Sequence, residues 1–238
     1  MKLCYVFLGN YGSGKTELAL NFAINAAKSG PSALVDLDIV NPYFRSAERK
    51  TELLEAGVRL IHPVFANAMV DVPALPPDIY SVFTDKYDTV IFDAGGDPAG
   101  AAALGQYKAY FEALESGVLE TLLVVNPFRP LSGSAAQVEE LLEKIRLRSR
   151  LAVTGLVNNA NLGNETTPAE LFLGLAMLAA VSDDTHIPVR YTTATKENLS
   201  AYLIEAEKQG IPKQYIGRPV EIARYTHRDW ERFTRAGV

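Results

Sequence analysis

The stretch Gly9-Asn10-Tyr11-Gly12-Ser13-Gly14-Lys15-Thr16 carries the strongest structural signal in this chain. It matches the pattern G-x-x-x-x-G-K-[ST], follows an apolar run over Leu3–Leu8 and precedes a helical pattern over Thr16–Lys28. Glycines let the backbone amides of such a loop converge on a polyphosphate, and the next helix adds its positive N-terminal end. We therefore predict that the whole stretch binds a nucleotide, with Lys15 acting at the β- and γ-phosphates and Thr16 on Mg²⁺.

Apolar runs of strand length alternate with amphipathic stretches of helix length along most of the chain. The runs lack apolar–polar alternation, which is typical of parallel strands buried on both faces. They cover Leu3–Leu8, Ala33–Asp36, Arg59–Ile61, Thr89–Phe92, Thr121–Val125, Ala152–Val157 and Pro188–Tyr191. The helical patterns cover Thr16–Lys28, Ala99–Glu115, Ser134–Arg148, Pro168–Val181 and Lys196–Gln209. This order predicts an α/β fold with a doubly wound, mostly parallel sheet, the three-layer P-loop NTPase fold, in a single domain over residues 1–238.

The composition limits the classes of function. Of the 238 residues, 48% are hydrophobic and 21% charged, as in globular proteins, and the net charge is −5. An acidic chain is a poor binder of nucleic acid or of an anionic membrane. The single cysteine, Cys4, excludes an intramolecular disulfide and a cysteine-ligated metal cluster within one chain. Because no signal-peptide pattern or membrane-spanning run is visible, we expect a cytoplasmic location.

Residues 218–238 form a basic C-terminal tail. The tail contains five arginines and three acidic residues, so it carries a net charge of +2 and the rest of the chain −7. The apolar residues of the tail do not form a clean helical stripe. We therefore predict a docked surface helix or a partner contact for this tail, in preference to a membrane anchor.

Carboxylates follow two of the predicted strands near their ends. Asp36 and Asp38 come at the end of the second run, and Asp93 closes the fourth, three residues before Gly96. Because parallel strands end at the edge where ligands bind, these side chains are expected beside the phosphate loop. Phosphoryl transfer needs carboxylates to hold the metal and to orient the attacking water, and Gly96 has an amide for the γ-phosphate. The alternative is that Asp36 or Asp38 merely caps a turn.

Together these motifs resemble the SIMIBI class of P-loop NTPases, and within it the ParA/MinD-like ATPases. The resemblance implies that Asp38 positions the hydrolytic water and is catalytic together with Lys15. It also implies that Asp36 and Asp93 lie near the Mg²⁺ shell, as metal-binding residues beside Thr16. The segments 38–45 and 93–100 then look like the two switch regions.

Asn10 marks a departure from that family. ParA/MinD-like ATPases carry a signature lysine at this position, which acts across a nucleotide-sandwich dimer. A nucleotide-dependent homodimer and an unidentified protein partner are the partners that the resemblance implies. The chain also lacks the CxxC pair of the metal-handling relatives.

The loop Asn158-Asn159-Ala160-Asn161 bears on the choice of base. GTPases of this class carry N-K-x-D here, and its aspartate accepts hydrogen bonds from guanine. In this chain an amide takes the place of that aspartate. In the alignment with the ATP-binding relatives, Asn159 matches an asparagine at the adenine edge, so Asn158 and Asn159 are predicted to bind the nucleotide and ATP is favoured over GTP.

The sequence therefore predicts a Mg²⁺-dependent ATPase of low turnover that acts as a nucleotide-driven switch. Three alternatives stay open. The first is an ATP-dependent small-molecule kinase or ligase, with Tyr43 and Arg45 near the substrate. The second is a GTPase resembling metal-insertion chaperones. The third is a nucleotide sensor that barely hydrolyses.

Overall fold

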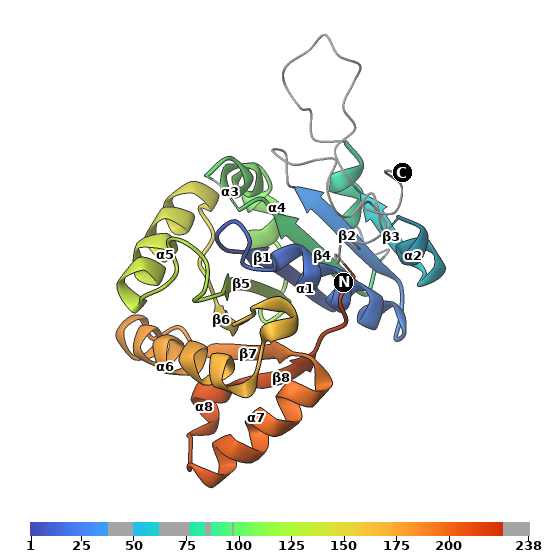
Figure 1. The fold of residues 1–238 in the computed structure, drawn as a ribbon. Coiled ribbons are helices and arrows are strands. Elements are labelled where there is room, and N and C mark those ends of the chain that lie inside the picture. Colours follow the sequence, from blue (N-terminus) through green and yellow to red (C-terminus); the bar gives the residue numbers. More distant parts are fainter. Residues whose placement is uncertain (38–49, 62–76, 84–86, 97, 226–238) are drawn as a thin grey trace, which may run out of the picture.

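The computed structural model describes residues 1–37, 50–61, 77–83, 87–96 and 98–225. In these residues one eight-stranded sheet has the order β3-β2-β4-β1-β5-β6-β7-β8 (Figure 1), and every neighbouring pair is parallel. The strands are β1 (Leu3–Leu8), β2 (Ser32–Leu37), β3 (Val58–Ile61), β4 (Thr89–Ala94), β5 (Leu119–Val125), β6 (Gly155–Asn158), β7 (Val189–Ala194) and β8 (Arg218–Glu221). The predicted doubly wound α/β fold is confirmed.

Helices cover both faces of the sheet. The α-helices are α1 (Lys15–Ala27), α2 (Lys50–Glu55), α3 (Pro98–Gly105), α4 (Lys108–Glu112), α5 (Ala135–Ser149), α6 (Pro168–Thr185), α7 (Lys196–Lys208) and α8 (Lys213–Ile216), and 3₁₀ turns cover Pro77–Phe83 and Gly163–Glu165. Alternate residues of the strands pack under α1 and α2 on one face and under α3 to α6 on the other. A third cluster joins α6 to α7 and α8.

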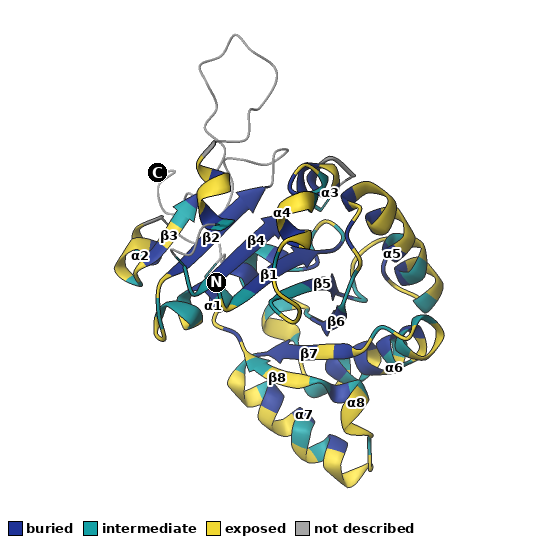
Figure 2. Cartoon of the chain, turned by 180° about the vertical axis from the view of Figure 1, so that it is seen from behind, coloured by how far each residue is buried: buried dark blue, intermediate teal, exposed yellow. Residues whose placement is uncertain are grey.

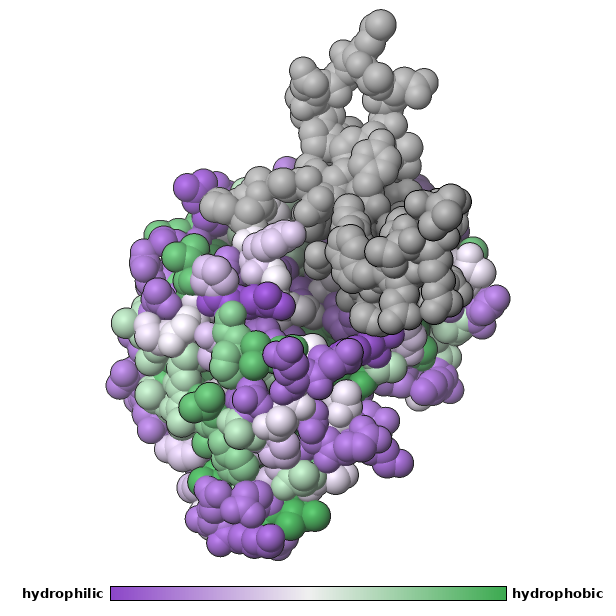
Figure 3. Space-filling model, in the orientation of Figure 1, coloured by the Kyte–Doolittle hydropathy of each residue, from purple (hydrophilic) through white to green (hydrophobic). Residues whose placement is uncertain are grey.

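The central strands are buried on both faces, as the unbroken apolar runs predict. Five of the six residues of β1 are buried, and all six of β2 are (Figure 2). On the face of the molecule shown in Figure 3, hydrophobic and hydrophilic residues of the described surface are interspersed. No helix in the described part of the chain has the length and apolarity needed to cross a bilayer.

Two predicted elements differ in the structure. The helical pattern Ala99–Glu115 is divided into α3 and α4, because the first helix ends at Gly105, which packs against the last carbonyls of α5. Residues 218–221, predicted as the start of a surface helix, form the edge strand β8 instead. Hydrogen bonding to β7 outweighs the helical tendency of these residues, which include a proline that an edge strand tolerates. Residues 226–238 of the tail lie outside the described residues.

The strand order brings the ends of β1, β4 and β5 together. The chain leaves β1 through α1 on one face of the sheet, and it leaves β4 and β5 through α3 and α5 on the other face. The carboxyl edge of these three strands is therefore a topological switch point, where open α/β sheets bind their ligands. The sequence Gly9–Thr16 lies at this edge and runs from the end of β1 into the first turn of α1.

Candidate nucleotide-binding site

The phosphate loop between β1 and α1 needs its glycines for two different reasons. Gly9 has a φ of 146°, and a Cβ there would overlap the Val124 carbonyl oxygen of β5. Gly14 caps α1 with a left-handed φ of 93°, and a Cβ there would overlap the Asn159 side chain. The first glycine therefore admits a neighbouring strand and the second a neighbouring side chain, and both positions favour glycine conformationally.

Lys15 lies at the centre of this loop. Its side chain is buried, with the residue only 7% exposed, and its Nζ donates a hydrogen bond to the Asn10 carbonyl oxygen at 2.9 Å. The Ser13 amide donates to the same oxygen at 3.2 Å, which closes the loop into a compact turn. The loop thus holds a cation beside backbone amides and the N-terminus of α1, the arrangement that binds a polyphosphate.

Two buried carboxylates lie on strands next to each other. Asp36 of β2 and Asp93 of β4 are direct register partners and are 8% and 3% exposed. Two residues earlier on each strand, Leu34 and Ile91 belong to the core under α1, so by strand alternation both carboxylates face the α1 side. Thr16 lies in the first turn of α1, so the structure brings together the elements that carry the three predicted metal-binding residues.

Gly96 lies directly against the phosphate loop. A Cβ at this position would be 2.7 Å from the Tyr11 amide nitrogen and 3.0 Å from Lys15 Nζ. No side chain fits into so close an approach, which places the backbone after β4 beside the lysine that is predicted to meet the γ-phosphate. Asp38, predicted to orient water, and Arg45 lie outside the described residues.

Hydrogen bonds to the loops after β5 and β6 hold the phosphate loop on its other side. Asn10 Nδ2 donates to the Pro130 carbonyl at 2.5 Å, and Arg129 Nε donates to the Gly12 carbonyl at 3.1 Å. Asn159 Nδ2 donates to the Ser13 carbonyl at 2.6 Å. The residues after β5 and β6 therefore act as an anchor for the loop.

The two predicted base-binding asparagines have different surroundings. Asn159 uses its oxygen as well, accepting a hydrogen bond from the Thr193 hydroxyl at 2.7 Å. Asn158 is fully buried and donates to the Leu171 carbonyl of α6 at 2.9 Å. Asn159 thus positions the phosphate loop and Asn158 positions α6, and the structure does not bring the Asn158 amide to the loop.

Sequence reasoning missed the anchor residues Arg129 and Pro130. Both follow the predicted strand Thr121–Val125, so they lie at the carboxyl edge of the sheet. The rule that ligands bind at this edge was a usable signal for placing these loops near the site. The pairing of Arg129 with Gly12 depends on loop conformation, for which the sequence has no pattern.

The donor set fits a hard cation. Among the described residues no group of three or more His, Cys, Asp or Glu side chains forms a metal site by itself. Mg²⁺ is usually held by one or two carboxylates together with substrate phosphates and water. Asp36, Asp93 and the Thr16 hydroxyl could supply the protein ligands and leave the other positions to phosphate and water. The site suits a metal that arrives with a nucleotide.

Comparison with solved structures identifies the fold. The chain is similar to the cell division protein FtsY from Thermotoga maritima (TM-score 0.52, 17% identity, covering 82% of this chain and 63% of that one). It is also similar to chloroplast FtsY from Physcomitrella patens (TM-score 0.54, 19% identity, 81% and 58% covered) and to FtsY from Mycoplasma mycoides (TM-score 0.51, 16% identity, 80% and 59% covered).

The chain thus spans about three fifths of the length of these FtsY chains. No protein-family model matches it, and no curated protein matches it in sequence. At these identities the likeness is one of fold. The chain has the P-loop NTPase α/β fold that these structures share.

Proposed function

We propose that this protein binds a nucleoside triphosphate with Mg²⁺ and hydrolyses it slowly, as a switch toward a protein partner. The observation that carries the proposal is the position of Lys15 in a closed phosphate loop, beside Gly96 and on the same side of the sheet as Asp93. A buried ammonium, converging amides and two carboxylates at one sheet edge are the parts that phosphoryl transfer needs.

The proposal assigns a role to each of these residues. Lys15 and the loop amides bind the β- and γ-phosphates, and the Gly96 amide meets the γ-phosphate. Thr16, Asp36 and Asp93 would hold Mg²⁺, which would supply positive charge beside the phosphates. Asp38 orients the attacking water, as the resemblance to ParA/MinD-like ATPases implies. The products are the nucleoside diphosphate and inorganic phosphate.

The switch follows from the contact between Gly96 and the phosphate loop. The segment that begins at Asp93 passes within van der Waals distance of Tyr11 and Lys15 and continues into α3. A γ-phosphate bound between Lys15 and Gly96 would fix this segment, and its loss on hydrolysis would release it. A partner that contacts α3 would then sense the nucleotide.

ATP is our proposed nucleotide, on the composition of the loop after β6. The first carboxylate after Asn158 is Glu165, so residues 159–164 have no acid to accept the two donors of guanine. The Asn159 side chain already forms hydrogen bonds with Ser13 and Thr193. It therefore supports adenine recognition less strongly than the sequence alone suggests. GTP is therefore the comparison that the binding experiment must include.

Calorimetric titration with non-hydrolysable Mg²⁺–ATP and Mg²⁺–GTP analogues tests the proposal. Lys15→Ala should weaken ATP-analogue binding by about 100-fold, because it removes a charge-assisted contact worth about 3 kcal/mol. Lys28→Ala, an exposed lysine that caps the other end of the same helix, is the matched control and should bind normally. Equal affinities of the Lys15→Ala and Lys28→Ala proteins would contradict the proposal.

Hydrolysis needs a separate measurement. In single-turnover assays Asp38→Ala should keep its affinity for Mg²⁺–ATP and lose phosphate release. Unchanged release would reassign the water-positioning role. A tenfold preference for the GTP analogue in the wild-type protein would replace ATP by GTP and leave the switch intact.

A further inference from the structure

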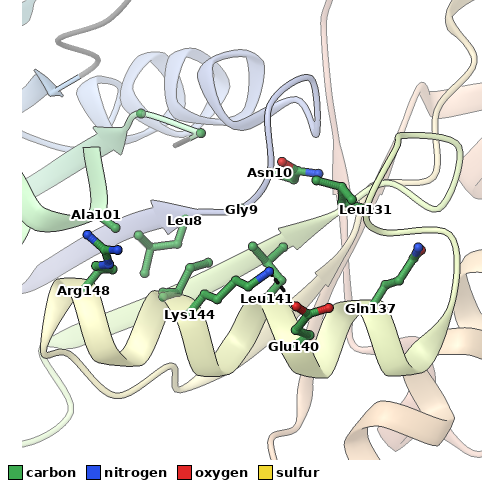
Figure 4. Close-up of a pocket in the computed structure, with 13 residues that line it drawn as sticks. Leu8, Gly9, Asn10, Ala101, Leu131, Gln137, Glu140, Leu141, Lys144 and Arg148 are labelled. Carbon is green, nitrogen blue, oxygen red and sulfur yellow. Dashed lines mark ion pairs between the residues drawn. The ribbon is translucent and has the colours of Figure 1, made fainter. Parts of the chain in front are cut away.

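A cavity of about 390 Å³ lies between α3, α5 and the ends of β1 and β4. Its walls are largely apolar and include Leu8 of β1, Ala101 of α3 and Leu141 and Ile145 of α5 (Figure 4). This volume is within the range of small-molecule sites, which are mostly apolar with a few placed polar groups. We call this cavity the α3–α5 pocket.

The charges on the α3–α5 pocket favour an anionic ligand. Lys144 pairs with Glu140 at 2.6 Å, which neutralises both (Figure 4). Arg148 also lines the pocket, at the end near Ala101, and has no ion-pair partner within the described residues. A guanidinium matches the geometry of a carboxylate, which it can bind through two parallel hydrogen bonds.

Leu131 presents an apolar side chain at the opposite end of the pocket, beside Asn10 (Figure 4). It is 67% exposed and has a left-handed φ of 64°, a backbone conformation that a leucine rarely adopts. The next residue, Ser132, fixes this turn through its hydroxyl, which donates to the Asn126 carbonyl at 2.9 Å. Strain that is held in place at the mouth of a cavity is typical of functional sites.

Two walls of the α3–α5 pocket also belong to the nucleotide site. Gly95 and Gly96 line it from the end of β4, and Gly9 and Asn10 line it from the phosphate loop. Gly100 of α3 packs against the backbone of Gly95, so the start of α3 and the segment beside the γ-phosphate position are in direct contact. Any nucleotide-dependent movement of this segment changes the shape of the pocket.

We propose that the α3–α5 pocket binds a small organic acid with an apolar body, and that this binding is coupled to the state of the nucleotide. The carboxylate lies on Arg148, the apolar body covers Leu8, Leu141 and Ile145, and the far end reaches Leu131. The coupling rests on the proposed nucleotide-binding function. By reciprocity the acid changes nucleotide affinity by the same factor by which the nucleotide changes acid affinity.

Displacement of the fluorescent probe anilinonaphthalene sulfonate by decanoate from the full-length protein tests this pocket. Arg148→Gln should weaken decanoate binding by about three- to tenfold, since Arg148 is exposed and solvent partly screens its charge-assisted hydrogen bonds to a carboxylate. Arg146→Gln is the matched control, because Arg146 is an exposed arginine on the same helix that pairs with Glu143 and does not line the pocket. Leu141→Phe, which fills the cavity, should abolish displacement with the fold intact by circular dichroism.

The coupling is measured by repeating the decanoate titration with Mg²⁺–ATP analogue and with Mg²⁺–ADP. An affinity ratio of at least about threefold is expected, mirrored in the affinity of the nucleotide with and without decanoate. Equal decanoate affinities of Arg148→Gln and Arg146→Gln would overturn the pocket assignment, and a ratio of one would overturn the coupling. Nucleotide binding measured without acid tests the proposed function by itself, so the two failures are distinguishable.

Discussion

The phosphate loop has two flanks that are built differently. On the flank of β5 and β6, Asn10, Arg129 and Asn159 make directed hydrogen bonds between loops. On the flank of β4, Gly96 meets the loop through close backbone packing, with Tyr11 N and Lys15 Nζ within reach of a Cβ. The β5–β6 flank is held by polar side chains, whereas the β4 flank is held by close packing of the backbone.

This difference separates anchoring from sensing. The hydrogen bond from the buried Asn159 side chain resists displacement, because breaking it leaves unsatisfied polar groups at about 1–3 kcal/mol each. A van der Waals contact between a glycine and a loop can open at little cost. We therefore expect nucleotide-dependent movement on the β4 flank, toward α3, while the β5–β6 flank keeps the loop preformed.

Removing the anchor should have the largest effect on this comparison. Asn159→Ala breaks the hydrogen bonds to Ser13 and Thr193, and we expect the free energy of unfolding to fall by about 2–3 kcal/mol. Because the phosphate loop loses its preformed shape, nucleotide affinity should fall by about 30-fold in calorimetric titration. An unchanged affinity would show that the loop does not depend on this anchor.

Asn158→Ala is the matched control for that variant. Asn158 is the adjacent residue, is equally buried and holds α6 through the Leu171 carbonyl. The Asn158→Ala variant should therefore lower the free energy of unfolding by a similar amount and keep a nucleotide affinity within about twofold of wild type. A comparison of ATP with tripolyphosphate then separates the two roles of Asn159, since equal losses indicate anchoring and a larger loss for ATP indicates contact with the base.

A glycine-to-alanine change tests the opposite flank. Gly96→Ala places a methyl group 2.7 Å from the Tyr11 amide, so the segment must move away from the loop. We expect binding of the triphosphate analogue to weaken by about tenfold and that of the diphosphate to change little, because only the γ-phosphate is predicted to reach this backbone. Equal losses of affinity for both nucleotides would mean that Gly96 only supports the phosphate loop and does not distinguish the triphosphate from the diphosphate.

The two flanks also differ in how far the sequence predicts them. The spacing from Gly9 to Thr16 and the apolar strands predict the loop, the sheet and the placement of Asp36, Asp93 and Gly96, because these depend on local geometry and on the rule that parallel strands end at one edge. The contact of Asn159 with Ser13 spans 146 residues and that of Arg129 with Gly12 spans 117. No local pattern encodes such contacts.

The strand β8 has a similar explanation. The segment from Arg218 is rich in arginine and contains a proline, so nothing local marks it as a strand, and its pairing with β7 makes it extended. The α3–α5 pocket could not be predicted from the sequence either, since its walls come from four separate segments. What the sequence predicts here is chemistry that lies on one motif or one strand end, and what it misses is chemistry assembled between loops.

The smallest expected effect belongs to Arg129. Its guanidinium is exposed and donates to Gly12 from the outside of the loop, so solvent screens the interaction. Arg129→Gln should raise the nucleotide dissociation rate by about two- to fivefold in stopped-flow displacement, and the difference from wild type should shrink at about 1 M salt. Arg146→Gln, exposed on α5 and away from the loop, should show neither change.

A much larger result would change the interpretation of the anchored flank. If Arg129→Gln lowered hydrolysis by 100-fold and left binding intact, the guanidinium would have to reach the phosphates when the triphosphate is bound. Arg129 would then supply the positive charge that the signature lysine supplies in ParA/MinD-like ATPases, from within the same chain and in place of Asn10. The flank that we describe as an anchor would also take part in catalysis, and hydrolysis would not require a second copy of the chain.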